Sequence, residues 1–248
     1  MKNIVLLTAK GSNSTLRNKN IIEINGKPSF LWSIDAAKEA KSVSHIFVST
    51  DSAQIADLAK ENGCEVIDRP NELSMPNTNH GDVIIHGLSS IQDLGLITNE
   101  DCLTVLLGNT VMTHASDIDN CYQALLNDYQ ATSALTVWKA QDDHPLRALI
   151  KNKNGYLNSY LDVDTPDTNR QSYCDVFFYD QGPWTTRVST ILSSSRSNSG
   201  CGPWWWMGDK CVGIERPWVT GRDTHSMFDV RISEFYLSMS ETRRRYFE

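Results

Sequence analysis

Short apolar runs alternate with longer amphipathic segments through the first 140 residues, and this alternation constrains the fold more than any other feature. Ile4–Leu7 has the character of a buried strand, whereas 52–62 has helical spacing, with Ser52 as N-cap and Gly63 as stop. Strands separated by helices require right-handed crossovers and a mostly parallel sheet. The expected strands are 3–8, 45–50, 64–67, 101–107 and 134–139, and the expected helices are 28–40, 52–62, 81–94, 117–128 and 227–245. The pattern predicts an α/β fold with a twisted sheet.

The pattern weakens between about residue 140 and residue 200, where short polar and aromatic pieces replace it. We interpret this stretch as a small subdomain inserted into a single domain of residues 1–248, covering an acceptor or forming a dimer contact. Within it, 189–202 is rich in serine and glycine and is expected to be a surface loop.

Charge and hydropathy exclude several classes of function. The net charge of −7 argues against broad nucleic-acid binding, which needs a basic face. No apolar stretch approaches the roughly 18 residues that a membrane span requires, and 1–3 leads directly into a strand without a leader pattern. We therefore expect a cytoplasmic protein without a membrane or nucleic-acid partner.

The loop after the first expected strand, from Thr8 to Asn20, is small, polar and cationic. In parallel sheets ligands bind at the carboxyl ends of strands, and here Lys10, Arg17 and Lys19 supply positive charge beside exposed backbone amides. The loop matches neither GxGxxG nor the Walker pattern. Taken alone, it is compatible both with phosphate binding and with a plain surface loop.

The surrounding residues add a resemblance. The run A-K-G-S-N-S-T-L-R-N-K-N, residues 9–20, resembles without a gap the first signature of the acylneuraminate cytidylyltransferase family, A-R-[GQ]-[GN]-S-K-x-[IL]-P-x-K-N. The resemblance continues through G-K-P-S-F-L-W-S-I-D-A-A, V-S-T-D and R-P-N-E-L, with weaker matches at 144–146, 169–171 and 221–225. It implies a Rossmann-like three-layer nucleotidyltransferase fold and a divergent member of the family.

The resemblance also implies a reaction, in which the hydroxyl of a small anionic acceptor attacks the α-phosphorus of CTP and pyrophosphate leaves. Its implied catalytic residues are Lys10, Lys19 and Asp223. The implied nucleotide-binding residues are Lys10, Gly11, Ser12, Asn13, Ser14, Lys19, Asn20, Arg69, Thr78 and His80. Positioned cations suit such transfers because the chemistry needs charge stabilisation and in-line geometry more than a protein nucleophile.

The same resemblance implies a Mg²⁺ site, an acceptor site and a homodimer. The expected metal ligands are Asp223, Asn109 and His225; Asn109 stands where a related subfamily has Asp, and His225 where the family has Asp. Because histidine is a poor Mg²⁺ ligand, Mn²⁺ is also considered, as is an acid–base or supporting role for His225. The expected acceptor-binding residues are Asn109, His144, Arg170, Gln171, Tyr179 and Asp180.

Departures from the family pattern cluster at the acceptor end. Lys10, Ser14 and Arg17 replace Arg, Lys and Pro in the loop, and 108–114 and 175–184 differ from the family's sugar-binding segments. A nonulosonic or ulosonic acid fits the family, whereas a phosphonate or other non-sugar anion fits a rebuilt pocket. A non-catalytic nucleotide-binding homologue is the alternative from another class. The tryptophan run 204–206 has two interpretations, stacking on a ligand or filling the core.

Overall fold

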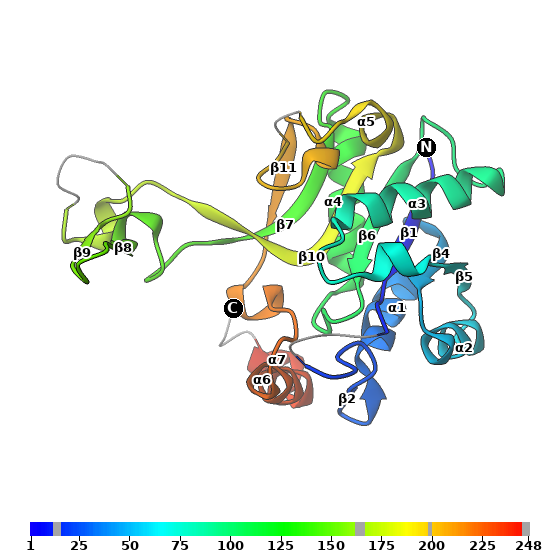
Figure 1. Cartoon of the computed structure of the whole chain (residues 1–248), viewed down its shortest axis with the longest axis horizontal. Coiled ribbons are helices and arrows are strands. Elements are labelled where there is room, and N and C mark those ends of the chain that lie inside the picture. The colour runs from blue at the N-terminus through cyan, green and yellow to red at the C-terminus, as the bar shows by residue number, and fades with distance from the viewer. Residues whose placement is uncertain (12–15, 162–166, 198–199, 245–248) are drawn as a thin grey trace.

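The computed structural model describes residues 1–11, 16–161, 167–197 and 200–244. Its centre is a seven-stranded sheet in which β10 runs against the other strands (Figure 1). The strand order is β11 (Cys211–Glu215), β7 (Ser133–Lys139), β10 (Phe177–Arg187), β6 (Cys102–Leu107), β1 (Asn3–Thr8), β4 (Val43–Thr50) and β5 (Glu65–Asp68). The predicted α/β fold with a mostly parallel sheet is therefore confirmed.

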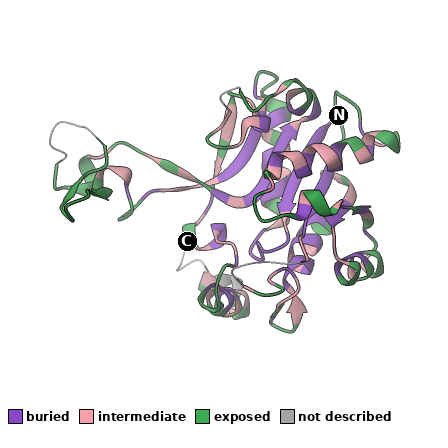
Figure 2. Ribbon diagram, viewed as in Figure 1, coloured by how far each residue is buried: buried purple, intermediate pink, exposed green. Residues whose placement is uncertain are grey.

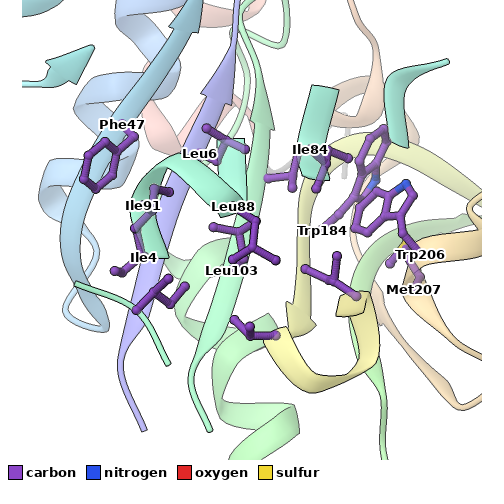
Figure 3. Packing of buried hydrophobic residues seen from close by; sticks show 14 of the residues in the cluster. Ile4, Leu6, Phe47, Ile84, Leu88, Ile91, Leu103, Trp184, Trp206 and Met207 are labelled. Atoms are coloured by element: carbon purple, nitrogen blue, oxygen red, sulfur yellow. The ribbon is translucent and has the colours of Figure 1, made fainter. Parts of the chain in front are cut away.

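Helices cover both faces of this sheet and give three layers. Helices α3 (His80–Asp93) and α5 (Val188–Ser193) lie on one face, and α1 (Ser29–Glu39), α2 (Ala53–Glu61) and α4 (Ala115–Asn127) on the other. Successive side chains of a strand point to opposite faces, so β1 contributes Ile4 and Leu6 to the first core and Val5 and Leu7 to the second. Figure 3 shows the first of these cores, with Ile4 and Leu6. Burial on both faces explains why the strand is continuously apolar.

The helix boundaries follow local capping chemistry. Ser52 accepts a hydrogen bond from the Ile55 amide at 3.4 Å, and Gly63, with φ +69°, follows α2, as the sequence predicts. For α4 the sequence predicts a start at residue 117 with Ser116 as the N-cap, and this was wrong: the helix begins two residues earlier, at Ala115, and the N-cap is His114. Asp117 accepts a hydrogen bond from the His114 amide at 3.0 Å, so a carboxylate caps the helix in place of the expected serine.

The segment between β7 and β10 leaves the core as an extended arm (Figure 1). It carries the short strands β8 (Leu149–Lys151) and β9 (Leu157–Ser159), and most of its residues are exposed (Figure 2). From Phe177 the chain returns to the sheet as β10. Only the first part of the stretch expected to be an insertion leaves the sheet. Residues 189–193, the start of the loop expected over 189–202, belong to α5, because Val188 and Ile191 enter the core.

The C-terminal segment forms two helices, α6 (Met227–Ser238) and α7 (Glu241–Arg244), rather than the single helix expected over 227–245. In α6 the buried face includes Val230 and Tyr236, whereas Phe228 and Phe235 are exposed. The small hairpin β2 (Glu23–Ile24) and β3 (Lys27–Pro28) packs beside α6, with Ile24 buried. Within the described part of the chain, no helix combines the length and apolar character needed to cross a bilayer.

Candidate active site

A cavity of about 280 Å³ opens where β1 and β6 end. Thr8 and Leu107, the last residues of these strands, line it, so the cavity lies at the carboxyl edge of the parallel sheet. Eight of the predicted site residues line this cavity: Lys10, Lys19, Asn20, Arg69, Thr78, His80, Asn109 and Asp223. Residues from five distant segments are thus brought together, which a plain surface loop would not do.

The described parts of the opening loop are held from two sides. The Gly11 amide donates to Asp51 Oδ1 at 2.8 Å, and the buried Asn20 donates through Nδ2 to the Lys10 carbonyl at 2.7 Å. A side chain at position 11 would not fit, because a Cβ there would come within 2.8 Å of Ser52 Cβ. Residues 12–14, which complete the predicted triphosphate contacts, lie outside the described residues.

Two cations face the cavity from this loop. Lys10 and Lys19 both line it, and Lys19 is partly buried. Burial lowers the pKa of Lys19 from its ordinary value, against the opposing effect of Asp223 and with a smaller lowering by Lys10. A partly desolvated ammonium group interacts more strongly with phosphate than an exposed one, because water screens it less.

Arg69, Thr78 and His80 form another part of the cavity lining. Arg69 is buried and donates through Nη2 to the Ser49 carbonyl at 2.6 Å and through Nε to Ser49 Oγ at 3.1 Å. His80 Nε2 lies 3.0 Å from Thr8 Oγ1. Burial, together with the nearby Arg69, lowers the pKa of His80 to about 4, so its imidazole is neutral near pH 7. A rigid arginine beside a neutral imidazole suits an uncharged ring such as a nucleobase.

The three predicted metal ligands converge on one carboxylate. Asn109 Nδ2 lies 2.9 Å from Asp223 Oδ2, and His225 Nε2 lies 2.7 Å from the same oxygen. A backbone hydrogen bond of 2.9 Å from Thr224 N to the Asn109 carbonyl fixes the two segments together. The described residues contain no group of three or more His, Cys, Asp and Glu side chains placed to hold a metal. A metal here would therefore rely on Asp223, an amide oxygen and ligand phosphates, a donor set that suits Mg²⁺.

A second cavity, of about 290 Å³, adjoins the first. Asp223 and Gln181 line both. Of the residues predicted to bind the acceptor, Tyr179 and Asp180 line this second cavity, and His225 lines it as well. Its remaining lining residues are Trp138, Trp218, Gly221, Arg222 and Asp229.

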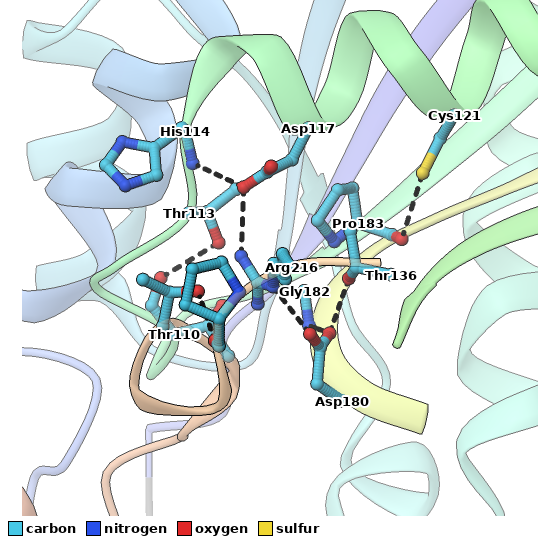
Figure 4. A network of polar contacts seen from close by, with 12 residues as sticks. Thr110, Thr113, His114, Asp117, Cys121, Thr136, Asp180, Gly182, Pro183 and Arg216 are labelled. Atoms are coloured by element: carbon cyan, nitrogen blue, oxygen red, sulfur yellow. Dashed lines mark hydrogen bonds and ion pairs between the residues drawn. The ribbon is translucent and has the colours of Figure 1, made fainter. Parts of the chain in front are cut away.

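Asp180, which the sequence predicts to bind the acceptor, is buried, and its carboxylate is held by protein groups. Its carboxylate accepts hydrogen bonds from Thr136 Oγ1, from the Gly182 amide at 2.7 Å and from Arg216 Nε at 2.5 Å (Figure 4). Arg216 also donates to Asp117 at 2.9 Å. Burial alone would lower the pKa of Arg216, but the two carboxylates outweigh it and raise the pKa.

The buried network of Asp180 determines where residue 181 lies. The pairing of β10 with β7 is interrupted between Tyr179 and Trp184, and Asp180 anchors the interruption by accepting from the Gly182 amide. Residue 181 is thereby directed to the junction of the two cavities, while Trp184 closes the first. The Asp180 carboxylate thus holds the backbone of the segment that carries residue 181.

The remaining predicted acceptor residues lie in the arm. His144, Arg170 and Gln171 line a separate hollow there, together with Tyr173. His144 is buried; its Nδ1 accepts from the Leu146 amide at 3.2 Å and its Nε2 lies 3.1 Å from the Cys174 carbonyl oxygen. Both ring nitrogens of His144 are thus used in hydrogen bonds within the arm. Within this single chain none of the three lines either cavity at the sheet edge.

Several lining residues were missed by the sequence analysis. Gln181 lies within 175–184, a segment that differs from the family's sugar-binding segment, and that departure was the available signal. The tryptophans of the run 204–206 lie in different environments. Trp206 is buried against Trp184, whereas Trp204 lines the first cavity and its ring centre lies 5.0 Å from that of Trp184. Trp204 Nε1 is buried and has no hydrogen-bond partner among the described residues.

Two lysines and a carboxylate at the carboxyl edge of a mostly parallel three-layer sheet suit the transfer of a nucleotidyl group. A family model described as Cytidylyltransferase matches residues 4–154. The chain therefore belongs to the cytidylyltransferase family.

Individual relatives match more modestly. The N-acylneuraminate cytidylyltransferase of Escherichia coli O18:K1:H7 is 27% identical over 175 residues, which are 69% of this chain and 39% of that protein. The CMP-N,N'-diacetyllegionaminic acid synthase of Campylobacter jejuni is 40% identical over 60 residues, 24% of this chain and 26% of that protein. The matches thus span less than half of these relatives' own length.

Solved structures share the fold across almost the whole chain. A CMP:2-keto-3-deoxy-manno-octonic acid synthetase complexed with CTP superposes with a TM-score of 0.69 at 14% identity, covering 96% of this chain and 99% of that one. A 4-diphosphocytidyl-2C-methyl-D-erythritol synthase gives a TM-score of 0.69 at 12% identity, with the same coverage. At these identities the likeness concerns the fold.

Proposed function

We propose that this protein transfers CMP from CTP to a small acidic sugar of the nonulosonic or ulosonic type and releases pyrophosphate. The observation that carries the proposal is the cavity at the sheet edge. Lys10 and Lys19 stand near Asn109 and Asp223, while Arg69 and its neighbours form a compact end for a base. The curated relatives named for N-acylneuraminate and legionaminic acid, and the solved synthetase complexed with CTP, support both substrates.

The reaction follows from the two adjoining cavities. CTP in the first cavity would present its α-phosphorus to the junction lined by Gln181 and Asp223, and the acceptor would approach from the second. The acceptor's hydroxyl oxygen bonds to the α-phosphorus, and the bond to the oxygen bridging the β-phosphate breaks. Pyrophosphate leaves with that electron pair, and the hydroxyl proton passes to solvent. Lys10 and Lys19 stabilise the charge that develops on the phosphate oxygens.

A divalent cation, Mg²⁺ with Mn²⁺ as a substitute, is part of the proposal. Asp223 and the side-chain oxygen of Asn109 would hold it, while His225 orients the Asp223 carboxylate. Such an ion neutralises charge on phosphate oxygens when bound.

We further propose a homodimer formed through the arm. The hairpin of β8 and β9 exposes apolar side chains on a support too small to bury them: Leu149 is 59% exposed, Ile150 52% and Leu157 61%. An isolated two-stranded hairpin is only marginally stable in water, and exposed apolar patches of this kind mark interfaces. Dimerisation would cover these side chains, and it is also the available route by which Arg170 and Gln171 reach an acceptor.

Pyrophosphate release tests the proposed activity. The protein would be assayed with CTP, UTP, ATP and GTP, each against N-acetylneuraminic acid, 2-keto-3-deoxy-manno-octonic acid, a hydroxyphosphonate and no acceptor. The proposal expects pyrophosphate release that needs both CTP and a sugar acid, and that Lys19→Met lowers about a hundredfold or more. Release with the phosphonate alone would replace the acceptor class, and CTP binding without release in any mixture would indicate a non-catalytic nucleotide-binding protein.

A further inference from the structure

Cys201 and Cys211 lie in contact with each other beside the first core. Cys201 precedes the tryptophan run and Cys211 is the first residue of β11, and both pack against the same hydrophobic cluster. A hydrogen bond joins their thiols, and both residues are only half-buried. A disulfide joins two sulfurs about 2.05 Å apart, so two neighbouring thiols can form one after a small movement.

The two thiols differ in how readily they ionise. The hydrogen bond from Cys211 lowers the pKa of Cys201 to about 7, although burial opposes this change. The same hydrogen bond and burial both raise the pKa of Cys211. Because the thiolate and not the thiol attacks a disulfide, Cys201 is suited to attack first and Cys211 to react second.

The other cysteines lack this arrangement. Cys64, Cys102 and Cys121 are buried, and burial raises the pKa of all three thiols. Such thiols are unreactive. Cys174 is exposed and lies in the arm, where it lines a hollow separate from both cavities. The chain thus carries one close pair of half-buried thiols among its six cysteines.

The backbone connects Cys201 to a wall of the first cavity. The Trp204 amide donates to the Cys201 carbonyl at 3.2 Å, and a Cβ at Gly200 would lie 2.4 Å from the Trp204 carbonyl oxygen, so this segment is folded tightly on itself. Trp204 lines the first cavity. Cys211, in contrast, is held in the sheet, where it pairs with Ser133. When the two sulfurs approach each other, Cys201 therefore moves, and Trp204 moves with it.

We propose that Cys201 and Cys211 are a modification site for small-molecule disulfides, and that the protein disulfide formed there displaces Trp204 in the wall of the first cavity. The Cys201 thiolate attacks one sulfur of a disulfide RSSR, a mixed disulfide forms and RS⁻ leaves. Deprotonated Cys211 then attacks the Cys201 sulfur and expels the second RS⁻. Two protein thiols and RSSR thus become one protein disulfide and two RSH, so the protein loses two electrons and two protons.

This modification site is separate from the proposed reaction, which uses neither thiol. Its effect on CTP rests on the proposed function, whereas formation of the bond does not. Because Trp204 belongs to the cavity wall, its displacement should weaken CTP binding. By linkage, bound CTP should disfavour oxidation of the pair by the same factor.

Glutathione disulfide is the probe for the bond. The reduced wild-type protein and Cys174→Ser, a control that removes the exposed cysteine of the arm, would be treated with it and mapped by peptide mass spectrometry without reduction. Both should form a bond between Cys201 and Cys211 that dithiothreitol reverses. Cys201→Ser and Cys211→Ser, each made in the Cys174→Ser background, test the order of attack.

The two variants should differ in their reaction with the probe. Cys211→Ser should retain one glutathione on Cys201. Cys201→Ser should react at least about tenfold more slowly, because the raised pKa of Cys211 leaves little thiolate. Equal rates would contradict the assignment of Cys201 as the attacking thiol.

Isothermal titration with CTP measures the effect on the cavity. Oxidation of Cys174→Ser should raise the dissociation constant of CTP roughly three- to tenfold, which corresponds to the loss of one aromatic contact. The Cys201→Ser variant, treated for the same time, should bind CTP equally before and after treatment.

The proposal is overturned if no bond joins Cys201 and Cys211, or if the bond forms and the CTP dissociation constant stays within about twofold. A reduced protein that does not bind CTP would refute the proposed function, and the mapped bond alone would then decide whether the pair is a modification site.

Discussion

Substitution of Asp180 tests whether its carboxylate stabilises the fold or binds the acceptor. The sequence predicts acceptor binding, whereas the structure pairs the carboxylate with the buried Arg216. The side chains of Asp180 and Arg216 are 0% and 4% exposed, and Asp117, the second carboxylate, is 12% exposed. Asp180→Ala would leave Arg216 with one anionic partner and would remove the acceptor of the Gly182 amide. Breaking a buried ion pair costs about 3–5 kcal/mol, so we expect the free energy of unfolding to fall by that amount.

Two further variants calibrate this value. Asp180→Asn keeps the shape and an acceptor oxygen but removes the charge, and about 1–3 kcal/mol should be lost, in the range of a hydrogen bond to a charged group. Asp142→Asn is the matched control, because Asp142 pairs with Arg147 and Arg170 but its side chain is 86% exposed. Its loss should be below about 1 kcal/mol, as for surface pairs.

Urea denaturation at pH 7, followed by tryptophan fluorescence, gives the three unfolding free energies. The reasoning is refuted if Asp180→Ala unfolds within about 1 kcal/mol of the wild-type protein while its KM for the acceptor rises. That result would indicate that Asp180 binds the acceptor. If the loss of stability is largest for Asp180→Ala, smaller for Asp180→Asn and smallest for Asp142→Asn, Asp180 stabilises the fold and holds the segment that carries Gln181.

The remaining predictions concern the nucleotide site and the arm. Lys19→Met should lower kcat about a hundredfold or more, since a placed charge is lost from the transition state; an unchanged kcat in single-turnover assays would exclude this role. Asp223→Asn should raise the Mg²⁺ concentration needed for half-maximal activity at least tenfold, measured by metal titration, and an unaltered Mg²⁺ dependence would remove Asp223 from the metal site. Because the pKa of His80 is lowered to about 4 from 6.5, the unfolded chain binds the proton more readily, and stability should fall as the pH drops from 6.5 to 4. In His80→Gln the free energy of unfolding should fall less between pH 6.5 and pH 4 than in the wild-type protein, by on the order of 1–3 kcal/mol, as measured by thermal unfolding. An equal fall in both proteins would contradict burial as the cause of the lowered pKa of His80. Ile150→Asp should convert the dimer to a monomer in light scattering, and a dimer that persists would place the interface elsewhere.

The first half of the fold was predictable because its signals are local. Runs such as Ile4–Leu7 are buried on both faces, and the serine cap and glycine stop of α2 mark its ends within the sequence itself. The end of the chain was harder. The predicted apolar face of this helix includes Phe228, Phe235 and Tyr236. In the structure Tyr236 is buried together with Val230, whereas Phe228 and Phe235 are exposed, and the N-cap of α6 turns Asp229 inward toward Arg222.

The first cavity of the candidate site was also more predictable from the sequence than the second. Lys10, Lys19 and Asn20 belong to one contiguous loop whose pattern is legible in the sequence, and the structure gathers them with Arg69 and Asp223. The second cavity draws on three segments, near residues 138, 180 and 222, that share no local pattern. They meet because β10 runs antiparallel beside β7 and is interrupted after Tyr179, a tertiary arrangement with no signature in the spacing of residues.

Identification of the product is the most direct test of the proposed activity. The protein would be incubated with CTP, Mg²⁺ and each sugar acid, and the products followed by ³¹P NMR and mass spectrometry. The account predicts equimolar pyrophosphate and a CMP conjugate whose single phosphorus is a diester to the acid's hydroxyl. CTP that remains intact with every acid, although it raises the melting temperature of the protein, would contradict the account.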